Sequence, residues 1–272
     1  DKLQLFPVET NDTWVRDYGP VTVETDHGLC LLDYQFNAWG NKHPCELDNA
    51  LTSALFELGA YPGASVQKRT LVLEGGSIET DGNGTLLTTA QCLLNPNRNP
   101  SFDQTAIEQQ LCKDLGVKKI NWLQHGALQG DDTDSHIDTL ARLCPNNVIA
   151  YQACDDITDS HYPELQLMAD ELQNMTSADG SSYRLIPLPW PSAKYDQTGQ
   201  RLPATYANFL VFNHLVIVPT YRDTKDSEAL AQLAKAFPGY QVEGVDCLPV
   251  IQQHGSLHCI TMQLPKGTLN AH

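Results

Sequence analysis

The chain has 272 residues, and its 33 Asp and Glu residues against 17 Lys and Arg residues give a formal charge of −16. This charge disfavours binding to nucleic acid or to an anionic membrane surface, and it favours cationic ligands. A hydrophobic fraction of 41 % with 18 % charged residues is typical of a globular protein and argues against disorder. The longest apolar stretch, 209–218, is broken by Asn213 and His214 and is too short to cross a bilayer.

Helical and extended segments alternate along the chain with a period of about 60 residues. Apolar residues spaced three or four apart predict helices at 47–58, 107–115, 165–175 and 230–237. Turn sequences between apolar segments predict hairpins around 26–28, 81–84, 145–147 and 213–214. One further apolar segment follows each helix, at 70–73, 119–123, 183–188 and 240–245. The repeated unit is therefore a hairpin, a helix and a strand.

A mixed repeat of this length is typical of modules that bury one another's faces in a ring or a solenoid. In a ring, the segments that precede the hairpins would converge, and they hold the most chemically capable residues: 14–17, 74–76, 136–138, 206–208 and, near the end of the chain, 258–259. A helix before the first hairpin would fall upstream of residue 1, so we expect the chain to begin inside a module. The alternative is a four-module protein in which an opening strand at 3–8 closes the ring directly.

Segment 130–138 reads Gly-Asp-Asp-Thr-Asp-Ser-His-Ile-Asp. Like charges at this density indicate a cationic ligand, because they otherwise repel one another. Asp131 and Asp132 are equally suited to capping a turn. On a strand, His136 and Asp138 would share one face. A metal site is disfavoured, because the other candidate ligands lie on separate modules and no zinc-binding spacing occurs.

Cys259 stands between a glycine-containing loop and an apolar segment, a position suited to a nucleophile. A thiol nucleophile also needs a histidine and a carboxylate that orients it, and Glu74 is the candidate carboxylate. The cysteines show no Cys-x-x-Cys pair, which favours reduced thiols and a cytoplasmic location over a disulfide framework. We expect six of the others to be small core residues: Cys30, Cys92, Cys112, Cys144, Cys154 and Cys247.

Three aromatic residues, Trp14, Trp39 and Tyr206, are suited either to the core or to an apolar slot for an aliphatic stem or a cation. Asn37 is a polar candidate beside Trp39. No serine in a Gly-x-Ser-x-Gly context and no phosphate-binding glycine loop occurs, which disfavours nucleotide hydrolysis.

Five segments in order along the chain resemble the agmatine deiminase and bacterial-type (Porphyromonas-type) peptidylarginine deiminase family of guanidine-modifying enzymes. They are Asn-Asp-Thr-Trp-Val-Arg-Asp-Tyr-Gly-Pro at 11–20, Leu-Glu-Gly-Gly-Ser-Ile-Glu at 73–79, Leu-Asn-Pro-Asn-Arg-Asn-Pro at 94–100, the acidic segment at 130–138, and His-Cys-Ile-Thr at 258–261. The resemblance implies an α/β pentein, a ring of five strand and helix modules, as a single catalytic domain over 1–272 that lacks the N-terminal part of its first module. It also implies a homo-oligomer.

The resemblance further implies a role for each matching residue. Cys259 matches the nucleophile, His136 the general acid and base, Glu74 the residue that supports it, and Asp17 and Asp138 the carboxylates that grip a guanidinium. Further candidate substrate contacts are Trp14, Trp39, Asn37 and Asp132. One departure is that His254-Gly255-Ser256-Leu257 replaces the family's usual run of glycines before His-Cys.

The expected reaction is cysteine-dependent hydrolysis of a guanidinium C–N bond, with agmatine and water giving N-carbamoylputrescine and ammonia through an amidino-thioether. Two carboxylates would hold the planar cation in line with the thiolate, so neither a metal nor an organic cofactor is required. The alternatives are free or peptidyl arginine as substrate, an amidinotransferase or another cysteine hydrolase, and a cation-binding protein with an inactive site.

Overall fold

The computed structural model describes residues 3–269, and the fold over these residues repeats one unit four times. In each unit two antiparallel strands form a hairpin, a helix follows, and a third strand then pairs parallel to the second. The same pairing holds in the two later units. The predicted unit of hairpin, helix and strand is therefore confirmed.

The units follow one another along the chain. The first contains β1 (Val21–Thr25), β2 (Gly28–Gln35), α3 (Leu51–Glu57) and β3 (Ala64–Val72). The second contains β4 (Ile78–Thr80), β5 (Thr85–Thr89), α5 (Gln104–Leu115) and β6 (Lys119–Leu123). The third contains β7 (Ala141–Cys144), β8 (Val148–Gln152), α6 (Tyr162–Gln173) and β9 (Arg184–Leu188). The fourth contains β12 (Leu210–Phe212), β13 (Leu215–Thr220), α7 (Asp226–Ala236) and β14 (Gln241–Asp246).

Short elements join and flank these units. They are the helices α1 (Val15–Tyr18), α2 (Ala38–Asn41) and α4 (Ala90–Leu93), the 3-10 turns η1 (Asp48–Ala50), η2 (Gly75–Ser77), η3 (Ile137–Thr139) and η4 (Ile251–Gln253), and the small hairpin β10 (Lys194–Tyr195) and β11 (Arg201–Leu202). Three of them, α1, η2 and η3, immediately precede the hairpins of the first three units. They place the residues before the hairpins near the centre of the molecule.

Helix α5 shows how local sequence sets the boundaries of a unit. The Asp103 carboxylate accepts a hydrogen bond from the Ala106 N–H at 2.8 Å, which caps the first turn. Ile107 and Leu111, four residues apart, are buried on one face. Gly116 ends the helix with a φ of +68°, a conformation that glycine adopts without strain. The chain is thereby turned back to form β6 beside β5.

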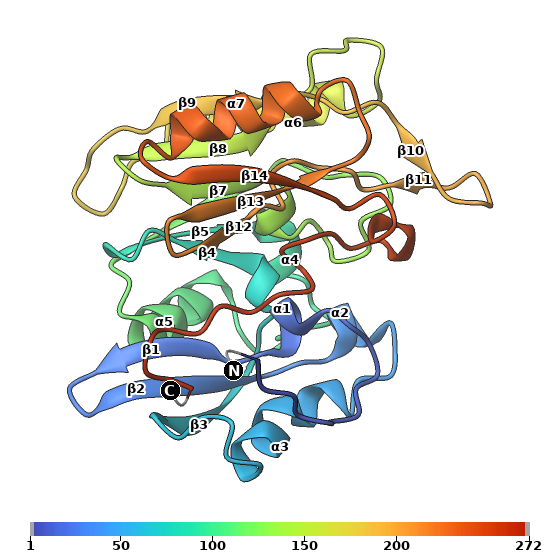
Figure 1. Cartoon of the computed structure of the whole chain (residues 1–272). Coiled ribbons are helices and arrows are strands. Elements are labelled where there is room, and N and C mark those ends of the chain that lie inside the picture. The colour runs from blue at the N-terminus through green and yellow to red at the C-terminus, as the bar shows by residue number, and fades with distance from the viewer. Residues whose placement is uncertain (1–2, 270–272) are drawn as a thin grey trace.

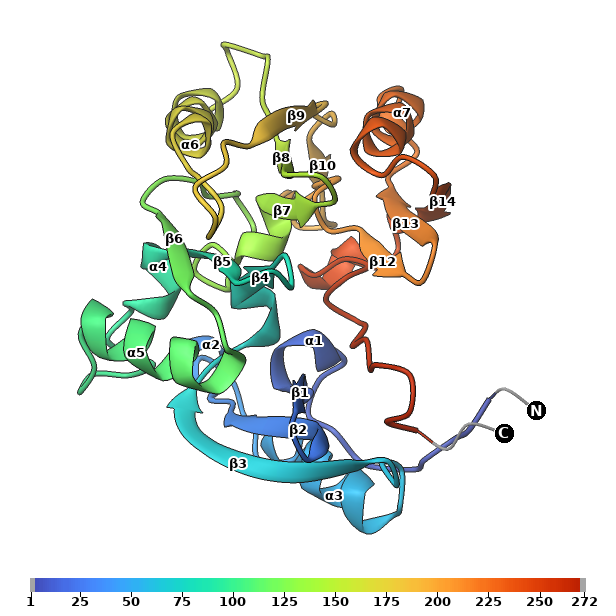
Figure 2. The ribbon, with the colours of Figure 1, turned by 90° about the vertical axis from the view of Figure 1, so that its left-hand side faces the viewer.

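The units are arranged with the helices outside and the strands inside (Figures 1 and 2). Three of the hydrophobic clusters each draw buried residues from two successive units: Leu71 and Leu111 in one, Leu123 and Met168 in the next, and Val148 and Val216 in the third. Successive units therefore bury one another's faces, as the repeat predicts. The last described segment returns to the first unit, where the Gly63 N–H donates to the Thr268 carbonyl.

The structure differs from the sequence expectations at four places. Residues 3–8 form no strand, so the alternative of an opening strand that closes the ring is not supported. Strand β3 begins at Ala64, six residues before the apolar segment predicted at 70–73. The η3 turn holds Asp138, with His136 capping it, in place of a strand. Residues 260–264 after Cys259 are irregular. The described residues contain four complete units and no fifth.

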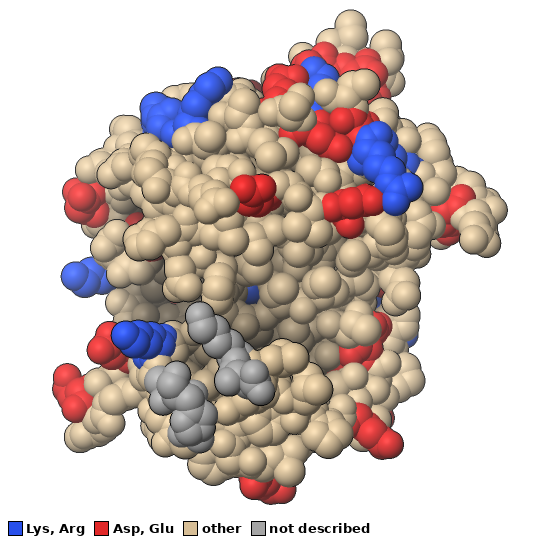
Figure 3. Space-filling view, in the orientation of Figure 1, with Lys and Arg blue, Asp and Glu red and all other residues tan. Residues whose placement is uncertain are grey.

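Within residues 3–269, no helix combines the length and the hydropathy that crossing a membrane requires. Acidic side chains are spread over the face shown in Figure 3, and Lys and Arg lie beside them at its upper end. The negative charge thus forms no single patch on this face.

Candidate active site

A cavity of about 190 Å³ lies where the segments before the hairpins meet. Six of the residues predicted from sequence line it: Trp14, Asp17, Trp39, Asp132, His136 and Cys259. A larger groove of about 940 Å³ is lined by the neighbouring residues Arg16 and His258 and by none of these six. The smaller cavity is therefore the candidate active site, because it gathers the reactive groups.

Asp17, His136 and Asp138 surround Gly76 of η2. The Asp17 Oδ1 atom lies 3.5 Å from His136 Nδ1 and accepts the Gly76 N–H at 3.0 Å. A Cβ atom at position 76 would lie 2.6 Å from His136 Nδ1, 2.7 Å from Asp17 Oδ1 and 3.2 Å from Asp138 Oδ2. Any side chain here would displace the polar groups, so this glycine is required by close approach.

Asp17 is held from a second side by Trp39. The Trp39 Nε1–H donates to Asp17 Oδ2 at 2.9 Å, and Trp39 itself has a φ of +55° in a tight loop. Asn37 supports that loop: its Oδ1 accepts the Gly40 N–H at 3.0 Å, and its Nδ2 donates to the Asn97 carbonyl at 2.9 Å. Asn37 is not among the residues lining the cavity, because both ends of its amide are engaged within the loop framework.

Asp138 is fully buried, and only one of its two carboxylate oxygens has a hydrogen-bond partner among the described residues. Its Oδ2 accepts a hydrogen bond from His258 Nδ1 at 2.7 Å, while Oδ1 has no hydrogen-bond partner among the described residues. The second ring nitrogen of His258 lies 3.2 Å from Arg142 Nη2, which can only donate, so the proton of the neutral ring is on Nδ1. Burial raises the pKa of Asp138 to about 7, against the opposing effect of Arg142 and Arg16.

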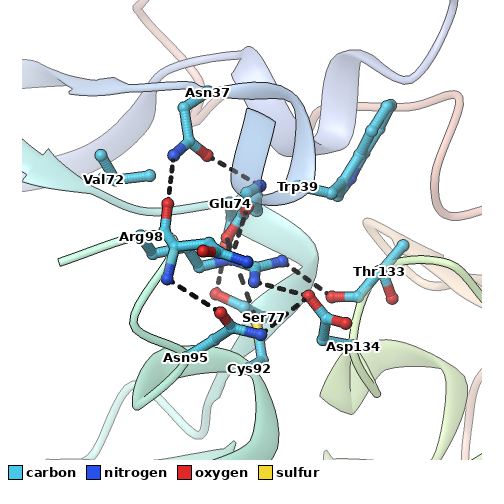
Figure 4. Close-up of polar contacts among 12 residues, drawn as sticks. Asn37, Trp39, Val72, Glu74, Ser77, Cys92, Asn95, Arg98, Thr133 and Asp134 are labelled. Atoms are coloured by element: carbon cyan, nitrogen blue, oxygen red, sulfur yellow. Dashed lines mark hydrogen bonds and ion pairs between the residues drawn. The ribbon is translucent and has the colours of Figure 1, made fainter. Parts of the chain in front are cut away.

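Glu74 is also fully buried, but it is neutralised by a resident guanidinium (Figure 4). Arg98 Nε lies 2.8 Å from Glu74 Oε1 and 3.0 Å from Oε2. The same guanidinium donates to Asp134 Oδ2 at 2.7 Å and to the Thr133 carbonyl at 2.9 Å. Arg98 therefore fastens the acidic segment 130–138 to the second unit.

His136 sits beside this ion pair without a direct bond to it. Polar atoms of Glu74, Cys92 and His136 lie within 4.8 Å of one another, yet His136 Nε2 has no hydrogen-bond partner among residues 3–269. Burial, with the nearby positive charge of Arg98, holds the pKa of His136 well below its ordinary value. The imidazole is therefore neutral and able to accept a proton.

Cys259 closes the cavity on the side of the fourth unit. Its Sγ lies 3.4 Å from Asn208 Nδ2 and 3.5 Å from Asn208 Oδ1, and its carbonyl accepts the Arg16 N–H at 3.1 Å. Burial, followed by the charges of Asp138 and Asp17, raises the pKa of the thiol well above its ordinary value. This shift favours the protonated thiol over the thiolate.

Sequence reasoning did not single out Asn208 as a site residue. A signal was present, because Asn208 lies just before the hairpin of the fourth unit, as Asp17, Glu74 and Asp138 lie before the first three. Tyr206, weighed as a slot residue, is instead a core residue whose hydroxyl donates to Asp226.

The outer part of the cavity is acidic. Its lining includes Asp12, Asp131 and Asp132, and it contains no Lys or Arg among the described residues. Asp132 is half exposed, with His43 Nε2 at 3.5 Å. Asp131 caps the acidic segment by accepting the N–H groups of Thr133 and Ser135.

Trp14 lines this outer part against the loop that precedes Cys259. A Cβ atom at Gly255 would lie 2.4 Å from the Trp14 ring, so any side chain at this position would clash with the indole. In place of a run of glycines, this loop has His254 in the left-handed conformation, with a φ of +68°. The His254 Nδ1 atom lies 2.8 Å from the Gly130 carbonyl.

Comparison with known proteins gives one consistent family. Residues 3–265 match the model of the Porphyromonas-type peptidyl-arginine deiminase family. A proposed agmatine deiminase of Shewanella sp. (strain W3-18-1) is 35 % identical over 97 % of this chain and 76 % of its own length.

Two solved structures share the fold closely. A proposed arginine deiminase from Porphyromonas gingivalis is 48 % identical with a TM-score of 0.94, covering 97 % of this chain and 78 % of that one. A variant of the C. jejuni agmatine deiminase with substrate bound is 44 % identical with a TM-score of 0.88, covering 94 % of this chain and 74 % of that one. The α/β fold is thus the one expected from sequence.

Proposed function

Because the chain belongs to the Porphyromonas-type peptidyl-arginine deiminase family, we propose that it hydrolyses a guanidinium C–N bond of agmatine, with Cys259 as the nucleophile. The observation that carries the proposal is the convergence of a thiol, a neutral imidazole and carboxylates at one cavity. Two buried atoms at this site, His136 Nε2 and Asp138 Oδ1, lack partners within the described residues. Buried polar atoms without partners are costly, and a cationic substrate rich in N–H donors would satisfy Asp138.

Asp17 and Asp138 would hold the guanidinium plane. A guanidinium presents its N–H donors in a fixed fork, and paired carboxylates accept them with defined geometry. Asp138 Oδ1 is free to accept, and each Asp17 oxygen has a second lone pair beyond its present bond to Trp39 or Gly76. The two carboxylates therefore fix the plane of the substrate and neutralise its charge.

Substrate binding would also activate the thiol. Burial, and after it the negative charges of Asp138 and Asp17, raise the pKa of the Cys259 thiol. A bound guanidinium neutralises those charges and places a cation near the sulfur, so the pKa of Cys259 falls. The thiolate then forms where its target carbon is held.

The reaction proceeds in two stages on the same sulfur. The Cys259 thiol first gives its proton to His136, and the resulting thiolate attacks the guanidinium carbon to form a C–S bond. The C–N bond to one terminal nitrogen then breaks as His136 delivers that proton to the leaving nitrogen, which departs as ammonia. The amidino-thioether is then attacked by water, from which His136 removes a proton. Breaking the C–S bond releases the ureido product and returns the thiolate.

The cavity mouth favours a substrate with a cationic tail. Asp132 is half exposed and Asp12 is partly exposed at this end, and no Lys or Arg lines it within residues 3–269. The primary amine of agmatine would be attracted to these carboxylates, whereas the carboxylate of arginine would be repelled. The mouth thus supports agmatine over free or C-terminal arginine.

The test is ammonia release from agmatine, free arginine and a peptide with a C-terminal arginine at equal concentrations. We expect agmatine to be preferred, N-carbamoylputrescine to be the product, and activity to persist with a chelator. The C259S variant should lose at least about 10³-fold in rate. Release of ammonia by C259S at the wild-type rate would overturn the cysteine mechanism, and preference for either arginine substrate would overturn the assignment of agmatine.

A further inference from the structure

Asn208 is a fully buried side chain that joins the nucleophile to the guanidinium-binding wall. Its Nδ2 lies 3.4 Å from Cys259 Sγ and 3.4 Å from the Asp138 carbonyl. Its Oδ1 accepts the His258 N–H at 2.9 Å. The amide therefore bridges the third unit and the segment that carries the thiol.

The neighbours of this amide fix which end faces which group. The His258 backbone N–H can only donate, so the atom that meets it is the oxygen. The Asp138 carbonyl can only accept, so the atom that meets it is the nitrogen. Nδ2 is thus held in place to donate to the sulfur, and it can do so best when Cys259 is ionised.

The position of Asn208 in the repeat has a chemical meaning. The equivalent segments of the first three units supply Asp17, Glu74 and Asp138, all carboxylates. The fourth unit supplies an amide, and this is the side chain that contacts the sulfur. A fourth carboxylate there would repel a thiolate, whereas an amide of nearly the same shape can donate to it.

We propose that Asn208 is a catalytic residue that stabilises the Cys259 thiolate through an N–H···S hydrogen bond. This inference rests on the proposed function, in which the thiolate is the attacking species. It makes Asn208 a direct partner of the reacting atom rather than a brace for the loop. The hydrogen bond opposes the effect of burial and of Asp138 and Asp17, which raise the pKa of the thiol.

The test measures thiolate formation without requiring turnover. The pH dependence of iodoacetamide alkylation would be followed on the Cys259 peptide by mass spectrometry in wild type, N208D and N208A. N208D keeps the shape of the side chain and removes the donor, while N208A removes the amide without adding charge. We expect alkylation at pH 8 to be at least about tenfold slower in both variants, because a hydrogen bond to a charged group is lost.

A matched control is N121D in the second unit. Asn121 is also buried, and its Nδ2 donates to the Thr176 carbonyl at 3.1 Å, far along the chain from the site residues. N121D therefore makes the same chemical change against the same kind of acceptor. We expect the pH dependence of Cys259 alkylation in N121D to be the same as in wild type.

The outcomes distinguish a catalytic role of Asn208 from a purely structural one. Slower alkylation in N208D and N208A, with kcat/KM for agmatine displaced to higher pH, supports the proposal. A wild-type alkylation profile in both variants, even with lowered melting temperatures, overturns it and leaves Asn208 a structural brace. If wild type releases no ammonia from any guanidine, the proposed function fails, while the alkylation comparison still decides the role of Asn208.

Discussion

Glu74 and Asp138 occupy equivalent positions in successive units, and both are fully buried, but different groups surround them. Glu74 has both oxygens on the Arg98 guanidinium. Asp138 has one imidazole N–H on Oδ2 and nothing on Oδ1. Within residues 3–269, neither Asp138 nor Asp17 has a Lys or Arg nitrogen at ion-pair distance.

Buried carboxylates at equivalent positions can therefore differ in whether the folded protein supplies a partner for their charge. The charge of a buried carboxylate can be compensated by a resident guanidinium, as Arg98 does for Glu74, where it opposes the rise in pKa that burial causes. A buried carboxylate without one is costly to ionise, as the pKa of Asp138, raised by burial to about 7, indicates. In the proposed function, Asp138 is the carboxylate that accepts the guanidinium of the substrate.

The first test of this contrast between Glu74 and Asp138 removes the charge of Asp138. D138N should lower kcat/KM for agmatine by about 10³- to 10⁴-fold, because a buried charge partner of the guanidinium is lost. Steady-state kinetics on the purified variant measure this. A loss of less than tenfold would contradict the assignment of Asp138 to substrate binding.

The same D138N substitution should raise the free energy of unfolding at high pH, although it lowers activity. The folded-state pKa of Asp138 is raised, so its contribution to stability is present at low pH and is lost as pH rises through about 7. D138N removes that loss and should be more stable than wild type at pH 8 by about 4 kcal/mol, with little difference at pH 4. Urea denaturation at both pH values checks the sign.

The second test removes the resident guanidinium. R98M leaves Glu74 buried without its ion pair and should lower the free energy of unfolding by about 3–5 kcal/mol. The double variant E74Q/R98M removes both charges and should recover more than half of that loss. Chemical denaturation of the three proteins provides the comparison. Equal destabilisation in the single and double variants would show that Arg98 acts by packing rather than by charge.

Much of this contrast is visible in the sequence, because the repeat aligns the residues before each hairpin. The period of the apolar residues predicts the helices and hairpins correctly, since each module buries one face of its own helix against a sheet. The family motifs then bring Asp17, His136 and Cys259 to one cavity and place Asp138 beside Asp17 and His136 around Gly76. These features depend on local pattern and on the symmetry of the repeat.

Other features depend on contacts that no local pattern encodes. The pairing of Arg98 with Glu74 joins side chains 24 residues apart whose meeting requires the loop after α4 to fold back. His136 and Asp138 reach the site from a 3-10 turn, because the capping of the acidic segment by Asp131 overrides an extended conformation. Asn37 does not line the cavity, because its amide is hydrogen-bonded to Gly40 and Asn97.

The third test concerns the space between the acidic groups. G76A would place a methyl group 2.6 Å from His136 Nδ1 and 2.7 Å from Asp17 Oδ1, so the groups must separate. We expect kcat/KM to fall by about 10²-fold, because small displacements of a catalytic group are costly. G244A on β14 is the control: its Cβ would meet only Thr220 and Leu230 side-chain atoms, at 3.0 Å and beyond, and activity should stay at wild type.

The smallest expected effect is the pH dependence of substrate capture. In the free protein the pKa of Asp138 is about 7, so below this pH a proton competes with the substrate cation for the same carboxylate. The value of kcat/KM should therefore fall by about tenfold per pH unit below pH 7. At saturating agmatine, kcat should fall less, because the bound guanidinium keeps Asp138 ionised. A kcat/KM that stays constant down to pH 5 would mean that Asp138 is already ionised in the free protein, and the contrast with Glu74 would then lie in hydrogen bonding rather than in charge.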